Sequence, residues 1–173
     1  MLVQHEPQVQ KRVEQPYVAI RRQVTDGVPA AVDSAFPELF GWLGEHGVKP
    51  SGPPFIRFLE VDAQGEPLEL EVAVPVVGGV EGDERVLAEV LPAGRYVTFL
   101  HAGPYRSTTE PDLAAARAMV QDWAVQQGIP WDRWDTDRGS AFRCYVEHYH
   151  VGPVEETDYS KWETELAYLV SES

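Results

Sequence analysis

The chain of 173 residues carries 28 acidic and 14 basic side chains, which gives a formal net charge of −14 at pH 7. A nucleic-acid-binding surface needs clustered Lys and Arg, so this balance argues against direct nucleic-acid binding and favours cationic ligands. The lone Cys144 rules out an internal disulfide, and no apolar run reaches membrane-spanning length. The start of the chain lacks the apolar core of a signal peptide, so we expect a cytoplasmic protein.

The first half of the chain predicts strands around one helix. Alternating apolar residues indicate strands at 12–24, 55–61, 68–76 and 84–92. Residues 29–46 have apolar side chains at helical spacing, namely Val32, Phe36, Leu39, Phe40 and Leu43. Because proline breaks the interior of a helix, we expect Pro37 to kink this element or to mark its true start.

The second half repeats this order. We expect a strand at 94–103, a helix at 108–128, and strands at 141–151 and 163–170. Thr109 is the candidate N-cap of the helix, and Gly128 is its expected stop.

The two halves also share particular residues. Tyr17-Val18 and Tyr96-Val97 lie 79 positions apart, and Trp42 and Gly47 recur 81 positions later as Trp123 and Gly128. We therefore expect one domain over residues 1–173, built from two β-α-β-β units at approximately 12–92 and 93–171. The predicted class is α+β, with one antiparallel sheet, both helices on one face, and a ligand pocket at the pseudo-twofold seam.

Four segments carry a resemblance to a known family: LPAGRYVTFLHAGPY (91–105), GPPFIRFLEV (52–61), LELEVAVPV (68–76) and KWETELAYLV (161–170). Together they resemble the GyrI-like small-molecule-binding family, also known as the effector-binding domain of AraC- and MerR-type transcription activators. The resemblance implies the duplicated fold and a ligand pocket at its seam. The helix-turn-helix domain of those regulators has no counterpart here, so we expect the stand-alone form. Relatives of this form are implicated in binding lipophilic, often cationic drugs, in hydrolysing cyclopropane-bearing toxins, and in inhibiting DNA gyrase.

The stretch YVEHYHVGP (145–153) holds the main candidate site. Side chains alternate along a strand, so Tyr145, Glu147 and Tyr149 are expected to share one face. The other side begins with Phe142, Cys144 and other apolar residues, and we expect that side to lie under the helices. Glu147 would then occupy the face that the helices leave open. The resemblance also implies Glu147, since family members carry an acid in the pattern that Val146 to Tyr149 match.

Two kinds of chemistry suit a glutamate between tyrosines. A partly desolvated carboxylate attracts an organic cation, and each ring face adds about 0.5–2 kcal/mol of cation–π attraction. Desolvation also prepares a carboxyl group to act as a general base. If the protein is an enzyme, Glu147 would activate a water molecule and Tyr149 would donate a proton. A small-molecule-binding protein, a hydrolase and a gyrase modulator all remain open, as does action beside a separately encoded regulator.

Five further residues are candidate ligand contacts. They are Tyr105 as a ring over the ligand, Trp131 and Trp134 as a lid, Phe40 on the first helix, and Glu165 as a second acid. Four of them have a structural alternative: core packing for Phe40, packing at the sheet edge for the two tryptophans, and a solvated or capping role for Glu165. We expect His101 to be a hydrogen-bonded structural residue.

A metal site has little support. His148 and His150 share a strand face, but zinc takes three or four ligands, and no CxxC, HExxH or third close histidine accompanies them. Phosphate-loop, dinucleotide and GxSxG signatures do not occur either. We therefore expect neither a metal nor an organic cofactor.

Overall fold

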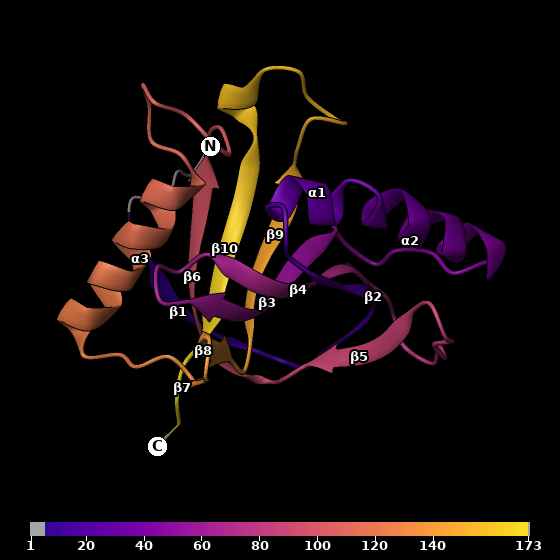
Figure 1. Ribbon diagram of the computed structural model, residues 1–173, viewed down its shortest axis with the longest axis horizontal. Coiled ribbons are helices and arrows are strands. Elements are labelled where there is room, and N and C mark those ends of the chain that lie inside the picture. Colours follow the sequence, from indigo (N-terminus) through magenta and orange to yellow (C-terminus); the bar gives the residue numbers. More distant parts are fainter. Residues whose placement is uncertain (1–5, 173) are drawn as a thin grey trace.

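The computed structural model describes residues 6–172 (Figure 1). Its strands are β1 (Gln8–Arg12), β2 (Gln15–Gln23), β3 (Phe55–Asp62), β4 (Pro67–Pro75), β5 (Leu87–Leu91), β6 (Gly94–Ala102), β7 (Arg133–Asp135), β8 (Gly139–Phe142), β9 (Tyr145–Val151) and β10 (Glu163–Leu169). Its helices are α1 (Val28–Val32), α2 (Ala35–Glu45), α3 (Leu113–Gln127) and the short 3-10 helix η1 (Tyr159–Lys161). None of these helices within residues 6–172 has the length and apolar content needed to span a bilayer.

The strands form one antiparallel sheet in the order β1-β6-β10-β9-β3-β4-β2-β5, with the β7–β8 hairpin attached to β3. The order is symmetric about the β9–β3 pair, which joins the two halves. The two edge strands occupy equivalent places: β1 pairs with β6 at one edge, and β5 pairs with β2 at the other. The predicted α+β fold, with two β-α-β-β units meeting at a seam, is confirmed.

The spacing between the two repeats is the same for whole strands as for single residues. β1 begins at residue 8 and β5 at residue 87, while β2 begins at residue 15 and β6 at residue 94. These offsets equal the 79 positions that separate Tyr17 from Tyr96. The single-domain organisation and the unit boundaries at 92 and 93 stay predictions.

The first predicted helix is divided in two: α1 ends at Val32 and α2 begins at Ala35, although the intervening Asp33 and Ser34 keep right-handed helical dihedral angles. Pro37 lies in the first turn of α2, which agrees with the expectation that it marks a true helix start. The predicted N-cap of the second long helix is wrong. Asp112 caps α3, since its carboxylate accepts a hydrogen bond of 3.1 Å from the backbone N–H of Ala115. Gly128 ends α3 as expected, with a left-handed φ of 68°.

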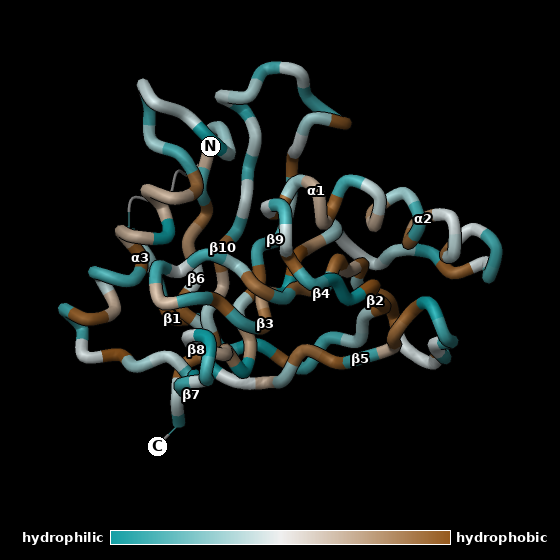
Figure 2. Tube along the Cα trace, in the orientation of Figure 1, coloured by the Kyte–Doolittle hydropathy of each residue, from teal (hydrophilic) through white to brown (hydrophobic). Residues whose placement is uncertain are grey.

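Both faces of the sheet are buried, but by different means. On one face, α2 and α3 contribute Leu39, Trp42, Leu113 and Val120 to a single core that spans both halves. Figure 1 shows α3 and α2 on opposite sides of β9 and β10, and Figure 2 shows the apolar residues concentrated in the central strands. The opposite face carries a second core rich in small residues, including Ala19, Ala73, Cys144, Val146 and Ala167. Small side chains suit this face because the sheet curls over them.

The sequence-based assignment of faces along β9 is wrong. Tyr145 belongs to the core under the helices, whereas Cys144 and Val146 belong to the core on the opposite face. Alternation correctly placed Tyr145, Glu147 and Tyr149 together, but apolar character could not identify the helix-covered face because both faces are apolar. The predicted strand at 141–151 is also interrupted at residues 143 and 144, where β8 ends and β9 begins.

Candidate functional site

Glu147 is a fully buried carboxylate, with 0% of its surface exposed. Arg117 of α3 binds it with two nitrogens, Nε to Oε2 at 2.6 Å and Nη2 to Oε1 at 2.9 Å. The hydroxyl of Tyr145 donates a further hydrogen bond to Oε2. A bidentate guanidinium is the strongest partner that a side chain can offer a carboxylate. Both oxygens of Glu147 are therefore occupied.

The fold brings these groups together from two separate elements. Glu147 lies in the centre of the sheet, paired with Ile56 of β3 and Leu166 of β10. Arg117 follows the buried Ala116 on α3, and its guanidinium lies 5.9 Å from the ring centroid of Phe58. Its side chain is 36% exposed, so this cation lies between the buried carboxylate and solvent. The Glu147–Arg117 pair thus joins α3 to β9, the strand at the seam.

The electrostatics of the site follow from burial and from this ion pair. Burial alone would lower the pKa of Arg117, but the charge of Glu147 more than reverses that effect, so the pKa of Arg117 is raised. Burial and the neighbouring Glu147 also raise the pKa of Tyr145 and that of Tyr149 well above the ordinary tyrosine value. Both phenols therefore stay protonated at neutral pH and act as hydrogen-bond donors.

A ladder of aromatic rings holds Tyr145 in place. Tyr145 stacks on Tyr168 with ring centroids 4.0 Å apart, and Trp131 stacks on the other side of Tyr168 at 4.5 Å. Phe58 lies against Tyr145 at 5.0 Å. In this ladder Trp131 packs against the sheet, which was the structural alternative to a lid.

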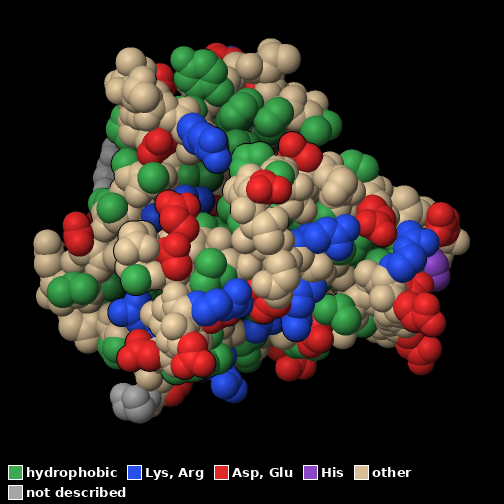
Figure 3. Space-filling model, viewed as in Figure 1, with side chains coloured by type: hydrophobic (Ala, Val, Ile, Leu, Met, Phe, Trp, Pro, Cys, Tyr) green, Lys and Arg blue, Asp and Glu red, His purple; other side chains and the backbone are tan. Residues whose placement is uncertain are grey.

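A second aromatic group lies further along β9. Tyr105 meets Tyr149 edge-on at 5.8 Å and Trp162 at 4.7 Å, and all three rings are half-buried. Burial, together with the charges of Glu155 and Glu147, raises the pKa of Tyr105 to about 12. Figure 3 shows hydrophobic side chains gathered around the upper ends of β9 and β10, where this group lies. Tyr105 and Tyr149 thus meet on the same side of the sheet as Glu147.

Three sequence candidates lie elsewhere. Glu165 is on the opposite sheet face, where Arg12 Nη2 binds its Oε1 at 2.9 Å. Trp134 is 53% exposed on β7 and lines a pocket on that opposite face. Phe40 is 42% exposed on α2, because the buried side of this helix consists of Ala35, Leu39, Trp42 and Leu43. The fold therefore does not bring all the predicted contacts together in one site.

The histidines have local roles. His101 is buried, and its Nε2 lies 3.0 Å from the carbonyl oxygen of Pro104, as expected for a structural residue. The rings of His148 and His150 lie 6.3 Å apart, and His148 packs on Phe55. Within residues 6–172, no group of three or more His, Cys, Asp or Glu side chains is placed to hold a metal ion.

Sequence reasoning missed Arg117, Tyr168 and Trp162. Arg117 carried a usable signal, since it is the sole basic residue between 108 and 128, in an otherwise mainly apolar stretch, LAAARAMV. Such an arginine on the inner side of a helix requires a buried acid as a partner. Tyr168 and Trp162 carried no comparable signal, because aromatic residues near the end of a domain are usually core.

A comparison with protein-family models identifies residues 5–170 as a GyrI-like small-molecule-binding domain. The chain belongs to this family. The structure of the EcmrR C-terminal domain is similar to that of this chain, with a TM-score of 0.69, 20% identity and full coverage of both chains. SAV2435 bound to tetraphenylphosphonium has a TM-score of 0.54 and 15% identity over 96% of this chain and 94% of its own. A hydrolase from Listeria innocua has a TM-score of 0.60 and 16% identity over 98% and 94%, respectively.

A comparison with curated proteins gives no match. At these identities the structural likenesses establish the fold, and the family model establishes a GyrI-like small-molecule-binding domain. The gyrase-modulator function stays a prediction, as does action beside a separately encoded regulator.

Proposed function

We propose that this GyrI-like domain binds lipophilic organic cations on the helix-covered side of the sheet, with Glu147 as the counter-ion. One observation carries the proposal: a fully buried carboxylate lies beside aromatic rings, and a single half-exposed cation, Arg117, balances its charge. Tyr149, Tyr105 and Trp162 supply the ring faces that such a ligand would contact.

Arg117 acts as the resident cation of the site in the absence of ligand. A buried carboxylate without a positive partner is costly, so a ligand can displace Arg117 only if it brings its own positive charge. The Arg117 side chain is 36% exposed and can turn outward, where water solvates its guanidinium. Exchanging one cation for another keeps the site neutral and selects against neutral and anionic molecules.

The relatives support a lipophilic cation as the ligand class. SAV2435, which shares this fold, has been solved with tetraphenylphosphonium, a permanent cation shielded by four phenyl rings. A ligand of this kind needs apolar contacts for its rings and one carboxylate for its charge. Each favourable ring face would add about 0.5–2 kcal/mol to its binding.

Calorimetric titration with tetraphenylphosphonium tests the proposal. We expect Glu147→Gln to weaken binding by about tenfold or more, because the buried counter-charge is lost. Glu165→Gln is the matched control, since Glu165 is also paired with an arginine but lies on the opposite face; it should bind as the wild type does. Equal affinity in the wild type and Glu147→Gln would show that another group holds the charge.

A neutral ligand of similar shape isolates the charge effect. Triphenylphosphine oxide keeps three of the four phenyl rings of the phosphonium but lacks its net charge. It should bind more weakly than the cation and respond little to Glu147→Gln. A similar loss for both ligands would instead indicate that the substitution disturbs the shape of the site.

Hydrolysis is the second candidate, supported by a structural neighbour from Listeria innocua that is described as a hydrolase. Glu147 would act as the base and Tyr149 as the proton donor. Because Arg117 binds both oxygens of Glu147, this arginine would first have to release at least one of them. Incubation with a cyclopropane-bearing alkylator, followed by mass spectrometry, separates the two functions. Product formation no faster than with Glu147→Gln would leave binding as the function of the site.

A further inference from the structure

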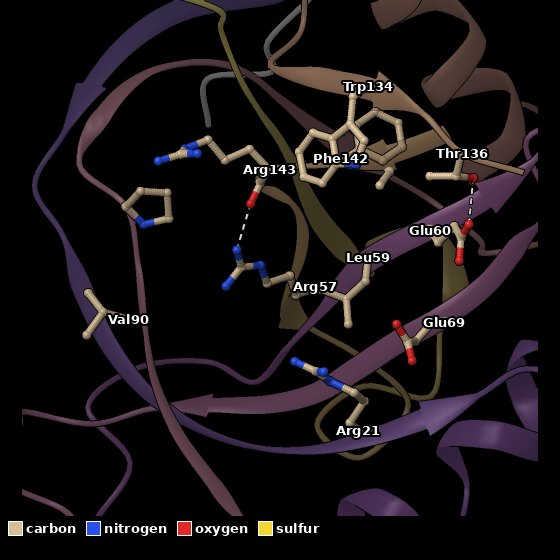
Figure 4. Close-up of a pocket in the computed structure, with 12 residues that line it drawn as sticks. Arg21, Arg57, Leu59, Glu60, Glu69, Val90, Trp134, Thr136, Phe142 and Arg143 are labelled. Atoms are coloured by element: carbon tan, nitrogen blue, oxygen red, sulfur yellow. Dashed lines mark hydrogen bonds between the residues drawn. The ribbon is translucent and has the colours of Figure 1, made fainter. Parts of the chain in front are cut away.

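The opposite face of the sheet carries a pocket of about 550 Å³ that has no part in the site at Glu147. It lies between the β7–β8 hairpin and the strands β2, β3 and β5 (Figure 4). Its apolar wall is formed by Trp134, Phe142, Leu59 and Val90. Its positive charge comes from three arginines, Arg21, Arg57 and Arg143. A volume of this size suits a drug-sized molecule.

Arg57 is the arginine whose charge is least compensated. Its Nη1 donates to the hydroxyl of Tyr17 at 2.7 Å, and its Nη2 donates to the carbonyl oxygen of Arg143 at 2.6 Å. Both acceptors are neutral. Its Nε–H is buried and has no hydrogen-bond partner among the described residues. Within residues 6–172, Arg57 also has no carboxylate within 4.0 Å, so its cation lies half-buried without an ion pair.

The remaining charged groups of the pocket already have partners. Arg21 pairs with the buried Glu71 at 3.1 Å, and Arg143 lies 3.6 Å from Asp132. Of the two acids in the wall, Glu60 accepts hydrogen bonds from Thr136 and Arg138, and Glu69 accepts one from Gln23. Glu60 is thus paired with Arg138, whereas the charge of Glu69 acts on Arg21, and Arg57 is the lining arginine without a carboxylate partner in residues 6–172.

We propose that this pocket binds an aromatic organic anion, such as a carboxylate or sulfonate on a ring system, with Arg57 as the anion contact. In Figure 4 the guanidinium of Arg57 lies in the middle of the ring of lining residues, with Arg21 and Arg143 on either side. An anion there supplies the negative partner that Arg57 lacks, and a guanidinium is suited to two-point contact with a carboxylate or sulfonate. Trp134 and Phe142 form the wall against which the aromatic body would pack.

The proposed anion site does not include Glu147, although its wall residue Phe142 packs edge-on against Tyr145 at 5.3 Å. The two sites lie on opposite faces of the sheet, and they differ in the sign of the charge that they require. In a chain with a formal charge of −14, an arginine-centred pocket also locally opposes the field of the whole molecule. Occupation of one site should therefore leave the other site available.

A pair of matched fluorescent probes tests the proposal. 8-Anilinonaphthalene-1-sulfonate carries an anionic group on an aromatic body, and N-phenyl-1-naphthylamine has the same rings without the charge. We expect the wild type to bind the sulfonate more tightly than the amine. Arg57→Gln should weaken the sulfonate about tenfold and the amine by less than about twofold. Arg95→Gln, which removes an exposed arginine outside the pocket, is the matched control and should change neither.

Two further measurements test whether the Arg57→Gln variant is correctly folded. Circular dichroism of Arg57→Gln should match that of the wild type, and its unfolding should stay cooperative at a midpoint above the temperature of the titrations. If this variant does not fold, Trp134→Ala replaces it, because Trp134 is 53% exposed and its loss should weaken both probes without disturbing the core. Unchanged affinity of both probes in Trp134→Ala would place them outside this pocket and overturn the proposal.

The same titrations can contradict the proposal in other ways. Equal losses of sulfonate and amine in Arg57→Gln would mean that the arginine shapes the pocket but does not hold the anion. Displacement of the sulfonate by saturating tetraphenylphosphonium would mean that both molecules occupy the site at Glu147. Retention of sulfonate binding in the presence of tetraphenylphosphonium, with selective loss in Arg57→Gln, supports the anion site.

Discussion

The two faces of the sheet each bury one glutamate beside a tyrosine and an arginine. On the helix-covered face, Glu147 accepts hydrogen bonds from Tyr145 and Arg117. On the opposite face, Glu71 accepts hydrogen bonds of 2.5 Å from Tyr17 and 3.1 Å from Arg21. The same three residue types therefore solve the same problem, a carboxylate in a low-dielectric environment, in both places.

The difference between the faces is a second guanidinium. Arg57 donates to the hydroxyl of Tyr17, the same hydroxyl that binds Glu71, and no counterpart of Arg57 approaches Glu147 in the described residues. The helix-covered cluster is thus neutral, with its cation half-exposed, whereas the opposite cluster has one positive charge in excess. Similar networks can therefore prefer ligands of opposite charge, because the preference follows from the total charge of the cluster.

Removal of Arg117 should have the largest effect. Arg117→Met leaves Glu147 buried without a positive partner, and we expect a loss of about 3 kcal/mol, the lower end for breaking a buried pair because Arg117 is partly exposed. The double variant Arg117→Met/Glu147→Gln should recover much of this loss. Urea denaturation of both variants measures the effect, with Arg95→Met as an exposed control. A loss of similar size in the double variant would show that the cost comes from packing and not from charge.

Two single variants, each lacking one tyrosine hydroxyl, compare the stability of the clusters on the two faces. Tyr17→Phe deprives Glu71 of a donor and Arg57 of an acceptor at once, so we expect a loss of about 2 kcal/mol in the free energy of unfolding. Tyr145→Phe removes a donor to Glu147 and the longer contact of 3.2 Å from Arg117 Nε, but it leaves both bonds from Arg117 to Glu147 intact. We therefore expect a smaller loss of about 1 kcal/mol. Denaturation curves of the two variants, recorded under the same conditions, show which substitution lowers the free energy of unfolding more. A greater loss in Tyr145→Phe would contradict the expectation that the Tyr17 hydroxyl, which bonds both Glu71 and Arg57, contributes more to stability.

The smallest expected effect is the pH response of the opposite face. Burial lowers the pKa of His148 from 6.5 to about 4. The unfolded chain therefore binds the proton more readily, so this residue lowers the stability as pH falls from 6.5 towards 4. The pKa difference sets an upper limit of about 3 kcal/mol, and we expect about 1 kcal/mol because the ring is partly exposed.

Unfolding curves of His148→Gln between pH 4 and pH 7 measure this contribution. The variant should lose stability less steeply than the wild type as pH falls. His150→Gln is the matched control, since His150 is exposed on the same strand, and it should follow the wild type. Parallel pH profiles for His148→Gln and the wild type would show that His148 does not titrate in this window.

Sequence reasoning reached Glu147 by a sound route and its surroundings by a partly wrong one. Alternation along β9 correctly grouped Glu147 with Tyr145 and Tyr149, because the two-residue period is a property of the strand itself. It could not tell which side the helices cover, since apolar residues line both sides. We expected the carboxylate of Glu147 to lie on an open face, where a ligand cation could bind it. It instead lies buried under α3 and is bound by Arg117.

The sequence by itself determined the order of the long strands and helices, the internal repeat and the family of this chain, but it missed the short strands β1 and β7. These features depend on local periodicity, on turn and cap residues, and on short segments in a characteristic order. The tertiary structure alone decided which face the helices cover and which charges meet. Arg117 and Glu147 are 30 positions apart, and Arg57 and Arg143 are 86 apart. Such pairs form only when distant strands and helices pack together, so the charge of each site is a property of the folded sheet.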